Sequence, residues 1–169
     1  LQKKANSFEF TSQDSVHYYL DRAIEIAPKD GNLYFQKALV YGTNNVRGVP
    51  YYEKAIECGN LLQEDNATAH YNIGYIYARR NEWKKARTNF KNAVILSTYN
   101  KGSNLYHLAL SNFELGNIDS AYDQVKEALR INPEYKLAIQ LYNKIEFQMS
   151  VKDDDQQQTT RTKSMIHTG

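Results

Sequence analysis

The residues that most often carry chemistry are few in this chain and lie far apart. Three consecutive carboxylates, Asp153 to Asp155, cannot surround a hard cation, so a solvated charge run is the simpler interpretation. A glycine-rich phosphate loop and a Gly-x-Ser-x-Gly turn are both absent from the sequence. The four histidines fall in separate segments, without metal-binding spacing, at His17, His70, His107 and His167. We therefore expect no enzymatic activity, no metal and no cofactor.

The single cysteine, Cys58, excludes an internal disulfide and is expected to pack as a small apolar side chain. This leaves the compartment open between the cytoplasm and a bacterial periplasm or cell envelope. The sequon at Asn66 would matter only in a secreted eukaryotic protein. We interpret it as a helix start, where Asp65, Asn66 or Thr68 supplies a capping oxygen.

The charge pattern narrows the class of partner. The 21 basic and 19 acidic side chains are interspersed and leave a net charge of +2. Without a basic block to neutralise a row of phosphates, nucleic acid is not an expected partner. The sequence also lacks the run of about 18 apolar residues that a membrane-spanning helix needs. Only three of the 169 residues are proline, which favours helices.

The segment from His70 to Leu96 shows how these helices are arranged. Gly74 is followed three residues later by Tyr77, and a second half carries small and aromatic residues at helical spacing. The polar break between the halves, around Asn81, has the length of a tight helix–helix turn. The segment therefore predicts a helical hairpin.

The same frame recurs along the chain. A small residue on each helix lets the partner backbone approach closely, and a large residue one turn away fills the space beside it. One hairpin alone would leave an apolar face in water, so such hairpins stack. The last small residue of the frame occupies Ala23, Ala55, Ala93 and Ala128.

This pattern resembles the tetratricopeptide repeat. The segment from Ala67 to Thr98 matches its motif, and Pro28 and Pro133 stand where the family has its closing proline. The resemblance implies an all-α fold, a right-handed α–α superhelix of about four helical hairpins plus a C-terminal capping helix. The domain would cover residues 1–149, with repeats at about 1–30, 31–66, 67–101 and 102–133, and the capping helix at 134–149.

Several features depart from the regular repeat. Gly48 and Pro50 predict that the second helix of the second repeat begins late, near Val49, with residues 43–48 as a loop. Extra residues from Gly59 to Asn66 predict a longer connection between the second and third repeats. Residues 150–169 lose the apolar periodicity and are expected to form a polar, mobile tail.

The resemblance also implies a binding surface, because the first helices of successive hairpins line a concave face in this family. Tyrosine suits such a surface, since it buries a large apolar body, keeps a polar tip and has few rotamers to lose. We expect the groove to be aromatic from the second repeat on. The candidate partner-binding residues are Phe35, Leu39, Tyr71, Asn72, Tyr75, Arg79, Tyr106, Leu110 and Phe113.

Chaperone-binding members of the family use a carboxylate clamp of two lysines, two asparagines and an arginine. In the last three repeats the corresponding positions match only at Asn72, and they lack the cations that would bind a C-terminal carboxylate. The five positions hold Phe35, Leu39, Asn72, Ser103 and His107. We therefore do not expect that subfamily.

Together these features predict a non-catalytic protein–protein interaction module, a scaffold whose concave groove binds a peptide or a protein segment of unknown identity. A second copy of the chain or the chain's own tail could also fill the groove. The alternative hypothesis is a regulatory or sensory segment of a larger enzyme or of a secretion or processing factor. The start at Leu1, inside the first helix of the frame, favours that alternative slightly.

Overall fold

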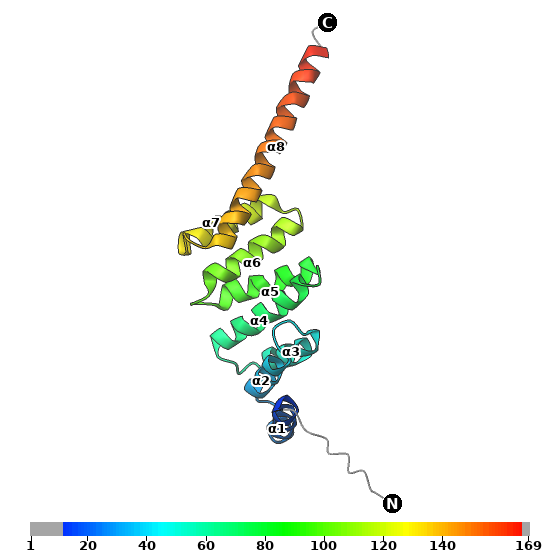
Figure 1. The fold of residues 1–169 in the computed structure, drawn as a ribbon, viewed down its shortest axis with the longest axis vertical. Helices are drawn as coiled ribbons and strands as arrows, with labels where there is room; N and C mark the ends of the chain where they lie inside the picture. The colour runs from blue at the N-terminus through cyan, green and yellow to red at the C-terminus, as the bar shows by residue number, and fades with distance from the viewer. Residues whose placement is uncertain (1–11, 167–169) are drawn as a thin grey trace, which may run out of the picture.

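The computed structural model describes residues 12–166, with side chains described from residue 13 to residue 151. This part of the chain consists of α-helices and one 3-10 turn, without a strand (Figure 1). The helices are α1 (Ser12–Ile26), α2 (Gly31–Tyr41), α3 (Val49–Cys58), α4 (Gln63–Ala78), α5 (Trp83–Leu96), α6 (Lys101–Glu114), α7 (Ile118–Ile131) and α8 (Lys136–Ile166), and the 3-10 turn η1 is Val46–Gly48.

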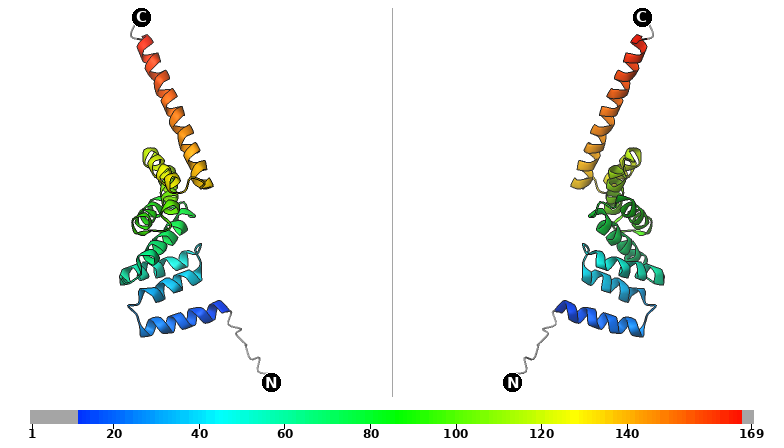
Figure 2. Two further views of the ribbon diagram at one scale, coloured as in Figure 1. Left: turned by 90° about the vertical axis from the view of Figure 1, so that its left-hand side faces the viewer. Right: turned by 90° about the vertical axis from the view of Figure 1, so that its right-hand side faces the viewer.

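Successive helices pair into hairpins that stack in chain order. The hairpins are α2 with α3, α4 with α5 and α6 with α7, while α1 packs on α2 and α8 packs on α7. The side views show the hairpins lying one above another (Figure 2). The described helices therefore supply three complete hairpins, the second helix of the first repeat and the capping helix. The N-terminal part of the first expected repeat, residues 1–11, lies outside the described residues.

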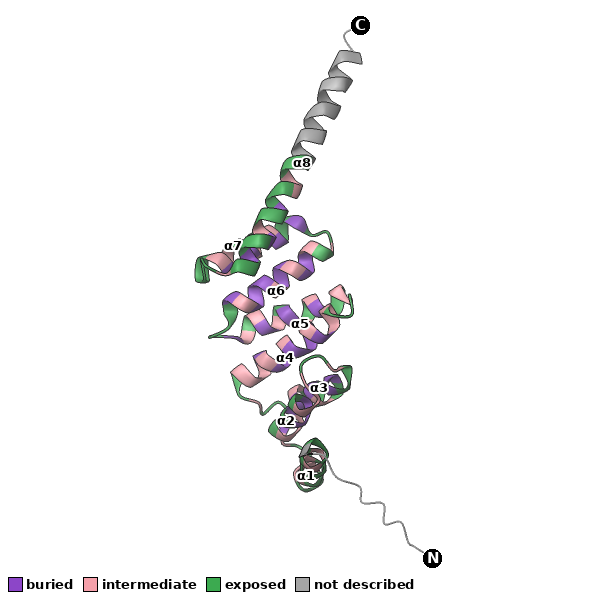
Figure 3. Ribbon diagram, in the orientation of Figure 1, coloured by how far each residue is buried: buried purple, intermediate pink, exposed green. Residues whose placement is uncertain are grey.

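The core consists of the small and large residues that the repeat frame predicts. Ala38, Ala86 and Ala93 are fully buried, and Phe90 is almost so. Gly74 of α4 shows why the small positions are needed, because a Cβ there would stand 3.0 Å from two ring carbons of Phe90. Buried residues gather where neighbouring helices face one another (Figure 3). Close backbone approach thus sets the spacing within each hairpin.

The late start of the second repeat's second helix is confirmed. The 3-10 turn η1 leads into α3, which begins at Val49 and has Pro50 in its first turn. The missing N–H of a proline costs nothing there, because the first amides of a helix have no partner within the helix. Gly48 fits against α2, where an added Cβ would stand 3.1 Å from the carbonyl oxygen of Ala38.

The connection between the second and third repeats is shorter than predicted. Only Gly59–Leu62 lies between the helices, because α4 begins at Gln63. The predicted side-chain caps are therefore wrong: Asp65 and Asn66 lie inside the helix, and its N-cap, Leu62, makes no capping bond. The Thr68 hydroxyl donates instead to the Glu64 carbonyl within the helix.

The extra turn of α4 is held by contacts to the end of α5, which no local pattern reveals. The Gln63 side-chain amide donates to the Leu96 carbonyl at 2.8 Å. The Glu64 carboxylate accepts a hydrogen bond from the Thr98 backbone N–H at 2.5 Å. Glu64 and Asp65 also place negative charge in the first turn, where the helix dipole favours it.

The capping helix is longer than predicted. Its buried residues Ala138, Leu141 and Ile145 pack with α6 and α7 residues in one core cluster, as a cap requires. However, α8 continues to Ile166 instead of ending at Met149. Glycine and proline, the usual helix terminators, are absent between Pro133 and Gly169, so no local signal ends the helix near residue 149.

Candidate partner-binding groove

An aromatic cage around His107 joins the third and fourth repeats. Tyr71 and Tyr75 of α4 approach the imidazole edge-on, with ring centroids at 5.2 and 6.0 Å. Phe90 of α5 stacks on it at 5.1 Å, and Tyr106 stands edge-on at 4.9 Å. The Tyr71 hydroxyl and His107 Nε2 are 3.1 Å apart and share a hydrogen bond. The cage therefore holds Tyr71 and Tyr75 in defined positions on α4.

Burial keeps this cage uncharged. Desolvation lowers the pKa of His107 to about 4, because the imidazolium would lose its water. Desolvation is also the main cause that raises the pKa of Tyr71 to about 12. At pH 7 the imidazole and the phenol are therefore both neutral. The pair suits packing and neutral hydrogen bonding, whereas a general base would need a pKa closer to neutrality.

Three of the predicted groove residues are buried, which corrects the expectation that they form an open surface. Phe35 packs edge-on against Tyr52, with ring centroids 5.8 Å apart, and Asn72 donates to the Tyr52 hydroxyl at 2.9 Å. Tyr106 is covered by Tyr135, whose ring centroid lies 5.1 Å away. The covering partners are Tyr52 on α3 and Tyr135 in the connection between α7 and α8.

The remaining predicted residues differ in how open they are. Leu39 is 43% exposed, Tyr75 is half-buried and Arg79 is exposed. Leu110 and Phe113 are partly buried against the cluster formed by α6, α7 and α8. The Lys144 ammonium of α8 lies over the Phe113 ring, 4.6 Å from its centroid. The open part of the predicted groove therefore lies mainly on α2 and α4.

A cavity of about 320 Å³ opens between the first halves of α4 and α6, beside the α5–α6 connection. Tyr71 and Asn72 line it, and both were predicted site residues. Its other polar residues were not predicted as site residues: Glu64, Thr68, Ser97, Asn100, Ser103 and Asn104. Sequence reasoning missed them because no motif joins them and the early start of α4 was not foreseen.

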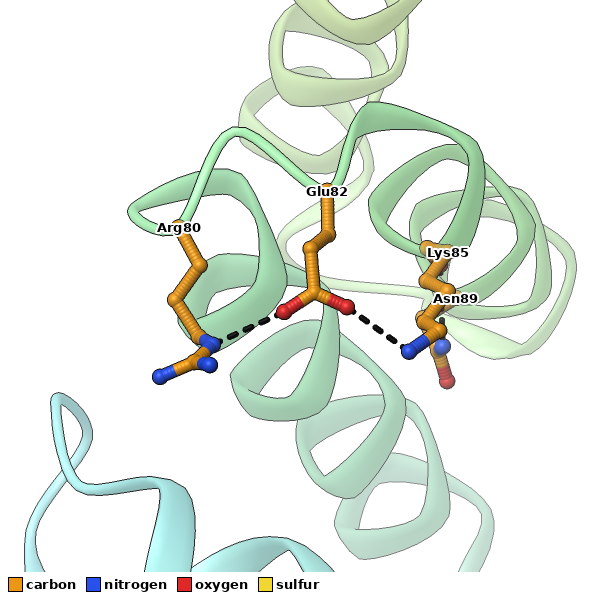
Figure 4. Close-up of polar contacts among 4 residues, drawn as sticks. All are labelled: Arg80, Glu82, Lys85 and Asn89. Carbon is orange, nitrogen blue, oxygen red and sulfur yellow. Dashed lines mark hydrogen bonds and ion pairs between the residues drawn. The ribbon is translucent and has the colours of Figure 1, made fainter.

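A second, shallower depression of about 670 Å³ lies between the α2–α3 connection and the end of α4. Tyr41 and Ile76 line it together with Arg79 and Arg80. Arg80 donates to the Glu82 carboxylate at 2.8 Å, and Lys85 donates to the other oxygen at 2.7 Å (Figure 4). These two cations hold the pKa of Glu82 below its usual range, and they stabilise the turn between α4 and α5.

The other candidate residues stay apart. His70 Nδ1 lies 3.1 Å from Asn89 Oδ1, while His107 sits in its aromatic cage, so the two histidines have different partners. Cys58 is half-buried and free. Among the described residues, no group of three or more histidine, cysteine or carboxylate side chains could hold a metal ion. Within the same part of the chain, no helix is long and apolar enough to cross a membrane.

Residues 103–135 match the sequence model of the tetratricopeptide repeat. This chain contains a tetratricopeptide repeat. The matched repeat covers most of α6, the whole of α7 and the connection between α7 and α8. It includes Tyr106 and His107 and thus one side of the aromatic cage. No curated protein matches this sequence.

Solved structures of tetratricopeptide proteins share the fold of the whole stack. The crystal structure of YrrB, described as a tetratricopeptide protein with an unusual peptide-binding site, is 23% identical, with a TM-score of 0.66, and the match covers 80% of this chain and 68% of YrrB. A structure of the MamA protein is 18% identical, with a TM-score of 0.69, covering 84% of this chain and 76% of MamA. A second MamA structure is 15% identical, with a TM-score of 0.60, and the match covers 85% of this chain and 98% of that MamA chain.

These similarities confirm the predicted fold class, an all-α, right-handed α–α superhelix of stacked hairpins. The tetratricopeptide repeat at residues 103–135 also supports a coarse function, that of a protein–protein interaction module.

Proposed function

We propose that the chain binds an extended or helical segment of a partner protein along its concave face. The central contacts come from a row of apolar side chains at one repeat position, directly after the small packing residue of each first helix. The row consists of Leu39, Tyr75 and Leu110. The observation that carries the proposal is that this row stays partly open while the packing positions beside it are filled by Ala38, Gly74 and Ala109.

The aromatic cage supports this proposal by preparing Tyr75 for contact. The Tyr75 ring stacks on Tyr71, with centroids 6.1 Å apart, and meets His107 edge-on. A tyrosine already held by its neighbours loses little rotamer entropy on binding, and its exposed edge still offers apolar area and a hydroxyl. Arg79, one turn further along α4, adds a cation at the end of the row.

The structure changes which substitutions test the groove. Tyr71 and Tyr106 take part in packing, so their loss would disturb the fold as well as the surface. Leu39→Ala combined with Tyr75→Ala shortens the two more open members of the row and leaves Tyr71, Tyr106 and the small packing residues unchanged. The matched control is Ile95→Ala combined with Tyr99→Ala, at positions that are 68% and 87% exposed and lie outside the row.

The experiment is a selection of binding peptides from a displayed library of random twelve-residue segments, followed by affinity measurements on the purified chain. We expect the Leu39 and Tyr75 double variant to weaken selected peptides by about 2 kcal/mol, the usual scale for aromatic and apolar hot spots, and to stay as helical as the parent. The control variant should bind like the parent. A groove variant that binds as tightly as the parent contradicts the proposal, as does a parent that selects no peptide.

A further inference from the structure

The polar groups that line the cavity between α4 and α6 are neutral except for one carboxylate. The cavity's described lining contains one charged side chain, Glu64, and several neutral hydroxyl and amide side chains. Two of the amides, Asn72 and Asn104, are only 4% and 3% exposed, so their polar atoms face either protein or this cavity. The lining also includes Tyr71 from the aromatic cage.

The side-chain N–H groups of both buried asparagines donate hydrogen bonds to acceptors within the protein. Asn104 Nδ2 donates to the Ala93 carbonyl at 3.3 Å, an acceptor that can only receive a hydrogen bond. Asn72 Nδ2 donates to the Tyr52 hydroxyl at 2.9 Å. Neither side-chain oxygen has a donor partner among the described residues. Neither oxygen is among the fully buried unpaired atoms, so both remain open to the cavity and can accept hydrogen bonds from a donor-bearing group there.

Glu64 adds a negative charge that no cation neutralises. Its carboxylate accepts hydrogen bonds from the Thr98 backbone N–H and from the Thr98 hydroxyl. These bonds hold the pKa of Glu64 below its usual range, so the group is ionised at pH 7. In the described part of the chain, no lysine, arginine or histidine lies within ion-pair distance of it. Glu82 differs in this respect, because Arg80 and Lys85 both contact its carboxylate (Figure 4).

We propose that this cavity receives the cationic side chain of a lysine or arginine from the partner segment, a refinement that rests on the proposed function of the groove. An ammonium carries three donors and a guanidinium five, and neither has an acceptor. Such a group satisfies the oxygens of Asn72 and Asn104 and pairs with Glu64. Tyr71 also lines this cavity, and the face of an aromatic ring attracts a cation.

Other ligand groups fit this cavity less well. An anion would place a second negative charge beside Glu64 and would leave the two asparagine oxygens without donors. A purely apolar side chain would also leave them unpaired. The N-terminus of α6, which begins at Lys101, favours anions, but at an exposed helix end that preference is weak and screened by salt. The two asparagine oxygens and the Glu64 carboxylate outweigh it.

The test uses a small cation, so it does not depend on knowing the partner. The probe is n-butylguanidinium, titrated into the isotopically labelled chain and followed by backbone amide NMR shifts of residues 67–72 and 97–104. The matched neutral probe is n-butylurea, which has a similar shape and no charge. We expect n-butylguanidinium to move these amides with an affinity at least about tenfold higher than n-butylurea, as hydrogen bonds from a charged donor require. Equal affinities for the two probes would overturn the proposal.

Two variants locate the binding. Glu64→Gln keeps an oxygen for the Thr98 bonds but removes the charge, so we expect about tenfold weaker binding of n-butylguanidinium with unchanged helicity. Ser103→Leu fills the cavity without touching the charge and should abolish the shifts. The control, Glu82→Gln, removes an equal charge from the distant turn and should leave binding intact. A Glu64→Gln variant that binds like the parent, or an equal loss in Glu82→Gln, would overturn the proposal.

Failure of this subsite and failure of the groove give different results. If the chain binds selected peptides through Leu39 and Tyr75 but ignores n-butylguanidinium, the cation site is wrong and the groove stands. If n-butylguanidinium binds at Glu64 but the Leu39 and Tyr75 variant does not affect peptide binding, the cavity is a cation site and the groove is wrong.

Discussion

At the scale of single residues, His107 is the side chain whose surroundings differ most from what its type suggests. Histidine is the usual switch near neutral pH, yet the rings of Tyr71, Tyr75, Phe90 and Tyr106 exclude water from this one. Its pKa of about 4 lies below the ordinary value of 6.5, so the folded chain keeps it neutral where an unfolded chain would protonate it.

This difference predicts a dependence of stability on pH. Between pH 6.5 and pH 4 the unfolded state binds more protons at His107 than the folded state, so the free energy of unfolding falls as the pH falls through this window. We expect a loss of up to about 3 kcal/mol from this group. Urea unfolding at pH 7 and pH 4.5 measures it. His107→Gln should lose less stability over the same interval than the parent, whereas His70→Gln, outside the cage, should follow the parent.

At the scale of helices, close contact within each hairpin depends on small side chains. Ala86 of α5 is fully buried, and Phe90 one turn later fills the space above Gly74 of α4. Lys91 lies on the opposite, exposed side of α5. The two faces of one helix therefore tolerate different volumes.

Ala86→Leu should destabilise the chain by about 1–3 kcal/mol, because the added methyl and methylene groups overpack the α4–α5 contact. Lys91→Leu, with the same new residue on the exposed face, should change stability by less than about 0.5 kcal/mol. Chemical denaturation of the two variants beside the parent provides the comparison. An unchanged midpoint and slope for Ala86→Leu would show that the contact is not tight.

At the scale of the whole molecule, each hairpin contacts only its neighbours, so stability is expected to be local. The cap shows this, because Leu141 of α8 is 5% exposed and belongs to the cluster it forms with α6 and α7, while the core residues around Phe35 form a separate cluster on α2, α3 and α4. In such a stack a defect spreads through neighbouring interfaces.

Leu141→Ala should cost about 2–5 kcal/mol locally and should lower hydrogen-exchange protection in α6 and α7 more than in α2 and α3. Leu137→Ala, one turn earlier on the same helix and 49% exposed, is the control and should change little. An equal loss of protection along the whole stack would contradict the local coupling and indicate one cooperative unit.

The sequence by itself determined the repeat frame, because that frame depends on local spacing of small and large residues. Ala55, Gly74 and Ala93 are buried at the close contacts predicted for them, and Pro50 places the start of α3. The row containing Leu39 and Tyr75 also follows from this register. Each of these features lies within one hairpin and recurs in the next, so the sequence alone is enough to find them.

Only the tertiary structure decided which groove residues remain open and which groups meet in the cavity. Phe35 and Tyr106 were expected on the surface, but Tyr52 of α3 and Tyr135 of the α7–α8 connection cover them. The length of α4 depends on Gln63 and Glu64 reaching residues some thirty positions later. The free oxygens of Asn72 and Asn104 likewise depend on partners in α3 and α5. Such contacts join residues that are far apart in the sequence, so no local spacing reveals them.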